Sequence, residues 1–479
     1  MTYASQQAQP PLKFIPPALN PWVLTSVQWL LPWWLRWRMG ITAVSVEGGE
    51  QLVELYRRFQ AKQVRFLIAF RHPSTDDPLC LAHLLGHYLP RAATQLSVPL
   101  RWPTHAHVLY DRGIPIWAGA KVGWLFSQLG GTPIQRGKLD RVGLRSARDL
   151  FMNGEFPMAV APEGGTNGHN ELISPLEPGV AQMGFWCQED LLKVGRHEEV
   201  MILPLGIQYH FQTDPWLALE QWLTHYEQDC GLLDPAQPLP APSPSAPPPH
   251  PATAQTANAS ISQLYQRLTR LGGHLLQMLE NFYQQFYHLT LPDLPMQEST
   301  TPNLHLSHRL QRLLDMVLKV AEDYFDLQAN GTVIDRCRRI EQAGWERIYR
   351  EDIADLEALS PLERSLADRI AQEAQLRMWH MRLVESFVAV TGVYVQEKPS
   401  AERFADTLLL IGDLMQRIQG SPSVRRPYLG ARRVEFRVGD PLSVTERWES
   451  YSTNRRAAKE AVALLTRDLQ TALQSLIHA

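Results

Sequence analysis

The chain has 479 residues, of which 44% are hydrophobic and 20% are charged, and its formal net charge at pH 7 is −3. This length has room for two or three domains, and the composition is typical of a globular protein. A net charge so close to zero argues against nucleic acid as a partner. The four cysteines are far apart and form no Cys-x-x-Cys pair, so we expect no metal site, no disulfide framework and a reducing cytoplasm.

The N-terminal segment is rich in tryptophan. Between residues 20 and 38 lie Trp22, Trp29, Trp33, Trp34 and Trp37, with Arg36 and Arg38 beside them. Gln28 and Pro32 interrupt this segment, which is shorter than the roughly 20 apolar residues that a spanning helix needs. Because Trp and Arg together suit the headgroup boundary, we expect residues 1–40 to attach the protein peripherally to the cytoplasmic face of a membrane. The alternative is a helix packed on the protein's own core. The first residues lack the pattern of a cleavable signal peptide.

Strand and helix patterns alternate between residues 43 and 210. Strands are predicted at residues 43–46, 64–70, 157–161 and 200–209. Helices are predicted at residues 51–61, 78–89, 118–129, 141–152 and 179–193. This alternation predicts an α/β domain over residues 41–232, with a mostly parallel sheet flanked by helices.

The rest of the chain changes character twice. Residues 233–259 are dense in Pro, Ala, Ser and Thr and are predicted to form an extended linker. Residues 260–424 carry leucines at spacings of three and four, which predicts an all-helical unit. In residues 425–479, an alternating stretch from residue 433 predicts a strand, and residues 454–477 predict a last amphipathic helix.

The clearest candidate for chemistry follows the predicted strand 64–70. His72 comes two positions after this strand, and Asp77 five positions after His72. Polar groups at the carboxyl end of such a strand face the edge of the sheet where ligands collect in α/β folds. His72 is therefore a candidate general base, and Asp77 could hold its ring in the tautomer that leaves one nitrogen free. The alternative is that Asp77, followed by a proline, is only the N-cap of the next helix.

Three further motifs follow in the sequence. A glycine-bearing turn begins at Gly131 and ends at Arg136, whose planar, permanently charged group suits phosphate. Residues 162–166, Pro-Glu-Gly-Gly-Thr, follow the strand predicted at 157–161, and the glycines allow a ligand close to the backbone. Pro204 lies inside the strand predicted at 200–209, where proline is normally unwelcome. Taken alone, each motif is also compatible with an ordinary turn.

In this order and spacing, the four motifs resemble those of the glycerolipid acyltransferase family, which includes lysophosphatidate and glycerol-3-phosphate acyltransferases. His72 to Asp77 resembles the family's His-x4-Asp block, and Arg136 the arginine that ends its second block. Residues 162–164 resemble its Pro-Glu-Gly block, and Pro204 its fourth block. The resemblance covers roughly residues 40–210 and resumes at 433–444. The helical unit would then be an insertion into the acyltransferase fold, a pattern that resembles acyltransferase-like proteins of cyanobacteria.

The resemblance implies a mechanism and a set of partners. His72 would deprotonate an acceptor hydroxyl, which attacks an acyl thioester directly, and Asp77 would orient the His72 ring. Arg136 would bind the acceptor's phosphate. Four residues of the third block would help to bind the substrate: Glu163, Gly164, Gly165 and Thr166. The donor would be acyl-carrier protein or coenzyme A, the acceptor a membrane lipid, most simply 1-acylglycerol-3-phosphate, and no cofactor or metal would be bound.

Two departures from the family pattern keep other interpretations open. Pro133 replaces an aromatic residue of the second block, and the third block has an extra Gly165 and Asn167 in place of an arginine. A phosphorylated acceptor remains the first hypothesis, and a neutral alcohol or glycolipid acceptor is the second. A catalytically inactive membrane adaptor is a third possibility. A serine hydrolase that pairs Ser74 or another serine with His72 is the weakest, because no Gly-x-Ser-x-Gly motif is present.

Overall fold

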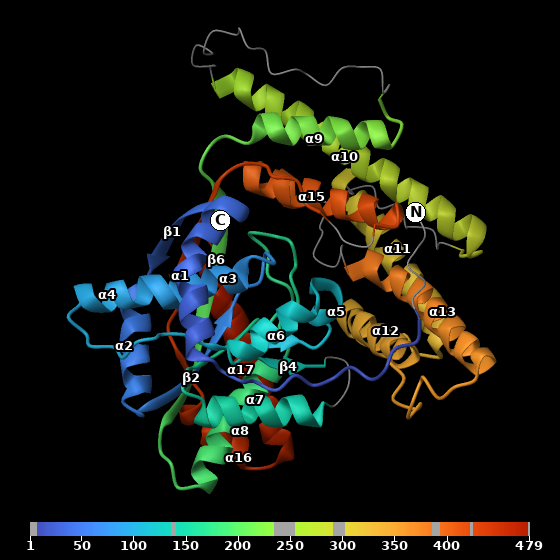
Figure 1. Cartoon of the computed structure of the whole chain (residues 1–479). Coiled ribbons are helices and arrows are strands. Elements are labelled where there is room, and N and C mark those ends of the chain that lie inside the picture. Colours follow the sequence, from blue (N-terminus) through green and yellow to red (C-terminus); the bar gives the residue numbers. More distant parts are fainter. Residues whose placement is uncertain are drawn as a thin grey trace. The chain divides into compact units, whose positions relative to one another are not determined.

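The computed structural model describes residues 7–135, 140–233, 254–290, 302–385, 393–421 and 425–477. The chain divides into two compact units (Figure 1). The sheet unit comprises residues 12–212 and 431–479, and the helical unit comprises residues 1–11 and 213–430.

The sheet unit contains one eight-stranded, mostly parallel sheet, which confirms the α/β class predicted from the sequence. Its strands are β1 (Ile41–Glu47), β2 (Val64–Phe70), β3 (His107–Asp111), β4 (Thr132–Ile134), β5 (Met158–Val160), β6 (Glu199–Phe211), β7 (Arg432–Val438) and β8 (Leu442–Ser443). The order is β1-β7-β6-β2-β5-β3-β4, with β8 paired to β6 beside β7. Only the β6–β7 and β6–β8 pairs are antiparallel.

The strands predicted from the sequence correspond to β1, β2, β5, β6 and β7, but β3, β4 and the two-residue β8 were not predicted. β3 is short and has polar residues at both ends, His107 and Asp111, so it lacks the apolar run of a central strand. β4 has only three residues and includes Pro133. Proline is tolerated there because β4 is the last strand of the sheet and pairs only with β3.

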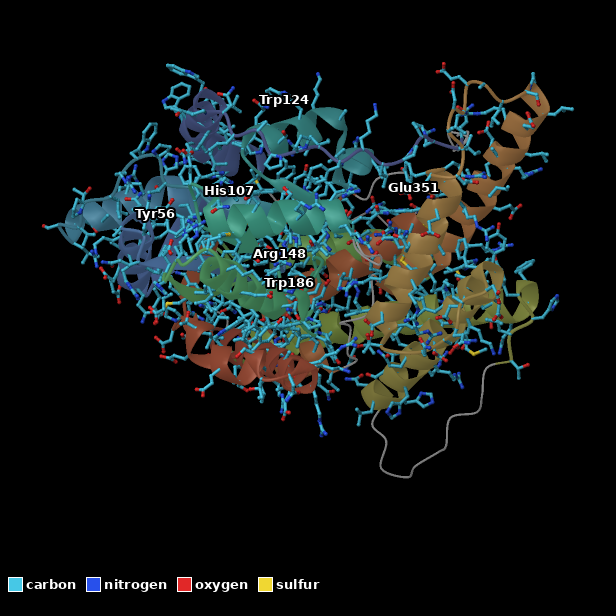
Figure 2. All side chains as sticks on the ribbon, turned by 90° about the horizontal axis from the view of Figure 1, so that it is seen from below. Tyr56, His107, Trp124, Arg148, Trp186 and Glu351 are labelled. Atoms are coloured by element: carbon cyan, nitrogen blue, oxygen red, sulfur yellow. The ribbon has the colours of Figure 1, made fainter. Side chains whose placement is uncertain are left out.

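Helices cover both faces of the sheet. One face packs against α1 (Pro21–Arg38), α2 (Gly49–Gln60), α3 (Asp77–His83), a π-helical turn (Leu84–Tyr88) and α4 (Leu89–Gln95). The other face packs against α7 (Arg141–Asn153), α8 (Gly179–Lys193) and α17 (Arg455–Ser475). α7 and α8 lie side by side, with the Arg148 guanidinium 5.2 Å from the centroid of the Trp186 ring (Figure 2). The shorter α5 (Ile114–Ala118) and α6 (Ala120–Gln128) connect β3 to β4, and the remaining short elements are a 3-10 turn (Thr445–Arg447) and α16 (Trp448–Ser452).

Pro204 is accommodated in the middle of β6 by a gap between two partner strands. On that side of β6, β8 pairs up to Ile202 and β7 pairs from Leu205 onward. The Pro204 carbonyl accepts a hydrogen bond from the N–H of Gly439 at 3.0 Å, in the turn between β7 and β8. Because the amide and carbonyl of one strand residue point to the same side, the missing N–H of Pro204 faces this turn and breaks no strand pair.

α1 has two different faces. Leu24, Gln28, Leu31 and Leu35 are buried against the sheet unit, so the helix does pack on the protein's own core. The five tryptophans predicted to meet a membrane are all exposed: Trp22, Trp29, Trp33, Trp34 and Trp37. Pro32 has no N–H to donate to the carbonyl of Gln28, and the His87 ring bonds that carbonyl instead, Nε2 to O 2.6 Å.

Among the residues that the structure describes, no helix combines the length and the apolar character needed to cross a membrane.

The helical unit consists of α9 (Trp216–Asp229), α10 (Ala254–Phe286), α11 (Pro302–Phe325), α12 (Val333–Ile348), α13 (Pro361–Glu385), α14 (Tyr394–Glu397) and α15 (Ala401–Ile418). α9 lies within the range expected for the α/β domain, but it belongs to this unit because it packs on α10 and α15. Its fully buried Glu227 carboxylate is bonded to Arg267 and Arg270 of α10, which compensates for the loss of water.

Candidate active site

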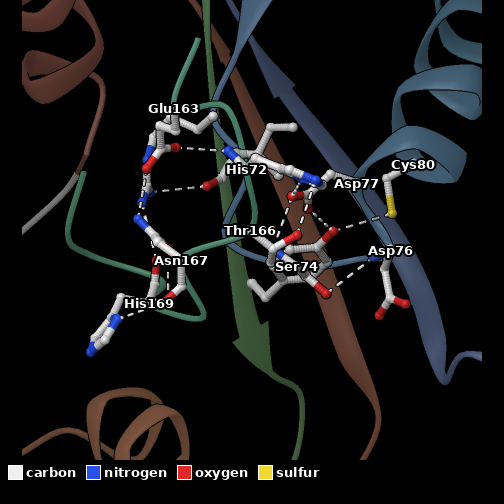
Figure 3. Close-up of polar contacts among 12 residues, drawn as sticks. His72, Ser74, Asp76, Asp77, Cys80, Glu163, Thr166, Asn167 and His169 are labelled. Atoms are coloured by element: carbon white, nitrogen blue, oxygen red, sulfur yellow. Dashed lines mark hydrogen bonds and ion pairs between the residues drawn. The ribbon is translucent and has the colours of Figure 1, made fainter. Parts of the chain in front are cut away.

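Sheet register brings the first and third sequence motifs together. β2 and β5 are parallel neighbours in which Ala69 pairs with Val160. His72 therefore lies three residues after Ala69, and Glu163 lies three residues after Val160, at the carboxyl ends of adjacent strands. The backbone N–H of His72 donates to Oε1 of Glu163 at 2.9 Å (Figure 3). The register of β2 and β5 thus positions the His72 loop against the loop that contains residues 162–168.

The His72 ring is held by Asp77. Nδ1 of His72 lies 2.8 Å from Oδ2 of Asp77, and the Asp77 carboxylate is fully buried (Figure 3). The same oxygen accepts the backbone N–H of Ser74 at 2.9 Å, and the other oxygen accepts the hydroxyl of Tyr209. Three donors from the protein therefore surround a carboxylate that is removed from water, which is the condition under which a buried charge is tolerated.

The structure also decides between the two interpretations of Asp77. Helix α3 begins at Asp77, its N-cap residue is Asp76, and neither side chain makes a capping hydrogen bond. The Asp77 carboxylate instead points back toward the loop and the His72 ring. The alternative that Asp77 only caps its helix is therefore wrong.

Tyr209, near the end of β6, is the second support of this carboxylate. Burial and the neighbouring Asp77 charge raise the pKa of its hydroxyl well above the ordinary value, so the group stays protonated and donates. Arg432, at the start of β7, places its guanidinium 5.0 Å from the centroid of the Tyr209 ring. The same arginine donates to Oδ2 of Asp76 at 2.8 Å. Residues from the two segments of the sheet unit are thus joined at the site.

Glu163 is nearly fully buried, with 3% of its surface exposed. Besides the His72 N–H, its carboxylate accepts Nδ2 of Asn167 at 2.7 Å and the N–H of Ser174 at 2.8 Å. Burial raises the pKa of the Glu163 carboxyl, and the Arg71 charge and the bonds from the His72 and Ser174 amides oppose that shift. In this arrangement Glu163 holds the two loops together and presents its carboxylate to protein groups.

Arg71 holds residues 169–172, which follow the loop that contains residues 162–168. Its side chain is fully buried. The guanidinium donates to the carbonyls of His169 at 3.1 Å, Asn170 at 2.7 Å and Leu172. It also approaches the Ile207 carbonyl of β6 at 3.3 Å. One side chain therefore fixes the residues that follow the third motif.

Thr166 completes the site on its solvent side. Its Oγ1 lies 3.0 Å from Nε2 of His72, and its side chain is exposed. Gly164 has φ +70°, a left-handed conformation that favours glycine, and Gly165 is exposed beside it. Of the four residues expected to bind substrate in this loop, Thr166 is the one whose polar group faces the free nitrogen of His72.

Ser74, the serine considered for a hydrolase, is placed differently. Its hydroxyl accepts the backbone N–H of Asp76 at 3.2 Å, and its backbone N–H is bonded to Asp77. No hydrogen bond joins Ser74 and the His72 ring among the described residues. Arg136, expected to bind phosphate, lies outside the described residues.

No protein-family model matches this chain, and a sequence search of curated proteins finds no match. Within the described ranges, no three or more His, Cys, Asp or Glu side chains gather as a possible metal site.

Sequence analysis missed three residues of the site: Arg71, Tyr209 and Arg432. Arg71 carried one usable signal, because a charged residue that directly follows an apolar strand must find buried partners or leave the sheet. Tyr209 and Arg432 gave none, since their relation to Asp77 and Asp76 depends on how β6 and β7 pair. The assembled group is an imidazole with one nitrogen held by a buried carboxylate and the other directed at a hydroxyl, which is an arrangement for general-base chemistry on a hydroxyl.

The first prediction concerns Tyr209. Tyr209→Phe keeps the ring but removes the donor to Asp77, and hydrogen bonds to charged groups contribute about 1.5–3 kcal/mol. We expect the free energy of unfolding to fall by that amount in urea titrations. Whatever reaction is assayed, kcat should fall by about tenfold with KM unchanged, since the loosened carboxylate orients His72 less well.

Tyr56→Phe is the matched control, because Tyr56 is also buried and donates to the His105 carbonyl at 3.0 Å, away from the site. It should lose stability without losing kcat. Equal effects of the two substitutions on kcat would show that Tyr209 has only a general structural role.

Proposed function

We propose that the protein is an O-acyltransferase that moves a fatty acyl group from an acyl thioester to the hydroxyl of a glycerolipid. The observation that carries the proposal is the geometry of His72. Its Nδ1 is bonded to a buried carboxylate, and its Nε2 lies 3.0 Å from a hydroxyl group on the exposed side of the site. A substrate hydroxyl in the place of Thr166 Oγ1 would meet the base at hydrogen-bonding distance.

The chemistry would follow from the tautomer that this geometry favours. The bond to Asp77 requires the proton on Nδ1, so Nε2 has a free lone pair. Nε2 takes the proton of the acceptor hydroxyl while that oxygen attacks the thioester carbonyl. The tetrahedral intermediate then expels the thiolate, which recovers the proton from the imidazolium as the new ester forms. Acyl-carrier protein or coenzyme A is the leaving thiol.

The acceptor that we favour is 1-acylglycerol-3-phosphate, with phosphatidate as the product. Arg136 is the residue assigned to its phosphate. Asn167, which stands where the resembling family has an arginine, directs its amide to Glu163 and to the Leu172 carbonyl. It therefore offers the substrate no positive charge, and a neutral or other lysolipid acceptor is the alternative.

Peripheral attachment to a membrane belongs to the same proposal. The five tryptophans of α1 are between 54% and 84% exposed, and Arg36 and Arg38 at the end of the helix are exposed beside them. Trp124 on α6 is a further exposed tryptophan of the sheet unit (Figure 2). At about 0.8 kcal/mol per methylene, a sixteen-carbon chain gains roughly 12 kcal/mol by staying in the lipid, so the enzyme must go to its substrate.

One observation favours a second candidate. Thr166, His72 and Asp77 form the hydroxyl–imidazole–carboxylate series of a nucleophilic catalyst. In this alternative, Thr166 would attack the acyl group itself, and an acyl-enzyme would pass the chain to water or to an alcohol. Ser74 is the weaker candidate for that role, because no hydrogen bond joins it to the His72 ring among the described residues and its hydroxyl instead accepts the N–H of Asp76.

The second prediction tests the base. General-base catalysis typically contributes a factor of about 10² to 10⁴. His72→Ala should lose acyl transfer by that factor in assays with acyl-coenzyme A or acyl-carrier protein and a panel of lysolipids. His197→Ala is the matched control, because His197 is exposed on the loop that enters β6 at the opposite edge of the sheet. Near-normal turnover of a folded His72→Ala protein would refute the mechanism.

The third prediction separates direct transfer from an acyl-enzyme. Thr166→Val removes the hydroxyl and keeps the shape of the side chain. If the acceptor hydroxyl attacks the thioester directly, kcat should stay within about tenfold of the wild-type value, or about 1.4 kcal/mol. Loss by about 10³ or more, with a covalent adduct on Thr166 found by mass spectrometry in the unmutated protein, would establish the second candidate instead.

The fourth prediction concerns the exposed face of α1. Replacing Trp33 and Trp34 by Ser removes two exposed rings and no buried contact, so the fold should persist while sedimentation with anionic liposomes falls severalfold. Leu464→Ser is the control, since Leu464 is an exposed apolar residue of α17 on the other face of the sheet. If both proteins sediment as the wild type does, these tryptophans do not hold the protein to membranes.

A further inference from the structure

The helical unit contains an apolar cavity of about 120 Å³. Its walls come from α10, α11, α13, α14 and α15. Figure 1 labels α10, α11, α13 and α15 in the helical unit. Along α10 the wall includes Tyr265, Leu268, Gly272, Leu275, Leu279 and Tyr283, which follow one another at spacings of three and four. One face of α10 therefore lines the cavity over five turns of helix.

Among the residues that the structure describes, no charged side chain lines this cavity. The four polar residues in its wall use their hydroxyl groups within the protein: Tyr265 with Asn303, Tyr283 with His380, Thr269 with the Tyr265 carbonyl and Thr407 with the Arg403 carbonyl. A cavity whose polar groups are already hydrogen-bonded to the protein offers water no partners. Such cavities stay dry and accept apolar molecules.

The size and shape of the cavity restrict the occupant further. From Tyr265 to Tyr283 is 18 residues, which is about 27 Å of helix at 1.5 Å per residue. A volume of 120 Å³ along so long a wall describes a narrow channel.

We propose that the helical unit binds one unbranched hydrocarbon chain in this cavity. A free fatty acid and the tail of a lipid share this chemistry. The site lies wholly within the helical unit and is independent of His72 and of the acyl transfer proposed above.

Gly272 offers a way to block the site. A Cβ built on Gly272 meets no atom within 4 Å, so a side chain there would extend into the empty space. Gly273, next to it on the same helix, does not line the cavity, and its nearest atom would be Leu306 Cδ1 at 4.0 Å. Both positions gain helix propensity when glycine is replaced by leucine, which makes Gly273→Leu a matched control.

The fifth prediction is tested first with the unmodified full-length protein. Isothermal titration with alkan-1-ols of 4 to 14 carbons should show affinity rising about fourfold per methylene until the chain fills the cavity, and then levelling off within the series. Adamantan-1-ol has the ten carbons of decan-1-ol in a compact cage, and it should bind at least tenfold more weakly. Affinity that rises without a break, or equal binding of the cage and the chain, would overturn the proposal.

Variants then locate the binding. Gly272→Leu should weaken decan-1-ol by at least tenfold, whereas Gly273→Leu and His72→Ala should stay within about twofold of the wild type. Thermal unfolding identifies any variant that has lost its fold. The titrations of the unmodified protein do not depend on the variants. Decanoate and decanoyl-lysophosphatidylcholine distinguish a free fatty acid from the tail of a lipid. If either probe binds the wild type and Gly272→Leu abolishes that binding, the result supports the site. If neither probe binds, or if Gly272→Leu leaves the binding unchanged, the proposal is overturned.

Discussion

The buried carboxylate of Asp77 is the interaction on which the candidate site depends. An ionised carboxylate taken out of water costs several kcal/mol unless protein donors replace the lost hydration. Here the donors come from three places, the His72 ring, the Ser74 backbone and the Tyr209 hydroxyl. The loop after β2, the start of α3 and the end of β6 must all be in position before this carboxylate is satisfied. The orientation of His72 is therefore a consequence of the whole central sheet.

Arg71 and His72, the two residues that directly follow β2, make different contacts at the site. The Arg71 side chain donates to the carbonyls of His169, Asn170 and Leu172, whereas the His72 ring lies against Thr166. Glu163 then ties the His72 backbone to the same loop. The two residues that directly follow β2 thus supply both the anchor of the loop and the imidazole that contacts it.

Apolar surface is used differently in the two units. In α1, four buried residues attach the helix to the sheet, and the tryptophans are left on the surface. In the helical unit, one face of α10 turns its apolar residues toward a cavity that water has no reason to enter. In the two proposals above, the exposed rings would contact hydrocarbon as a two-dimensional surface, and the cavity would bind it as a single chain.

The local sequence pattern was sufficient to predict the structure of a segment wherever that structure depends on the segment alone. It located β2 and α8 at their observed bounds and placed His72 and Asp77 at a strand end. It could not reveal β3 and β4, whose short polar segments become strands only because neighbours pair with them. It also left the role of Asp77 open, since an N-cap and a histidine partner have the same sequence. That choice, like the contribution of Tyr209 and Arg432, was made only by tertiary structure, because it depends on which strands lie side by side.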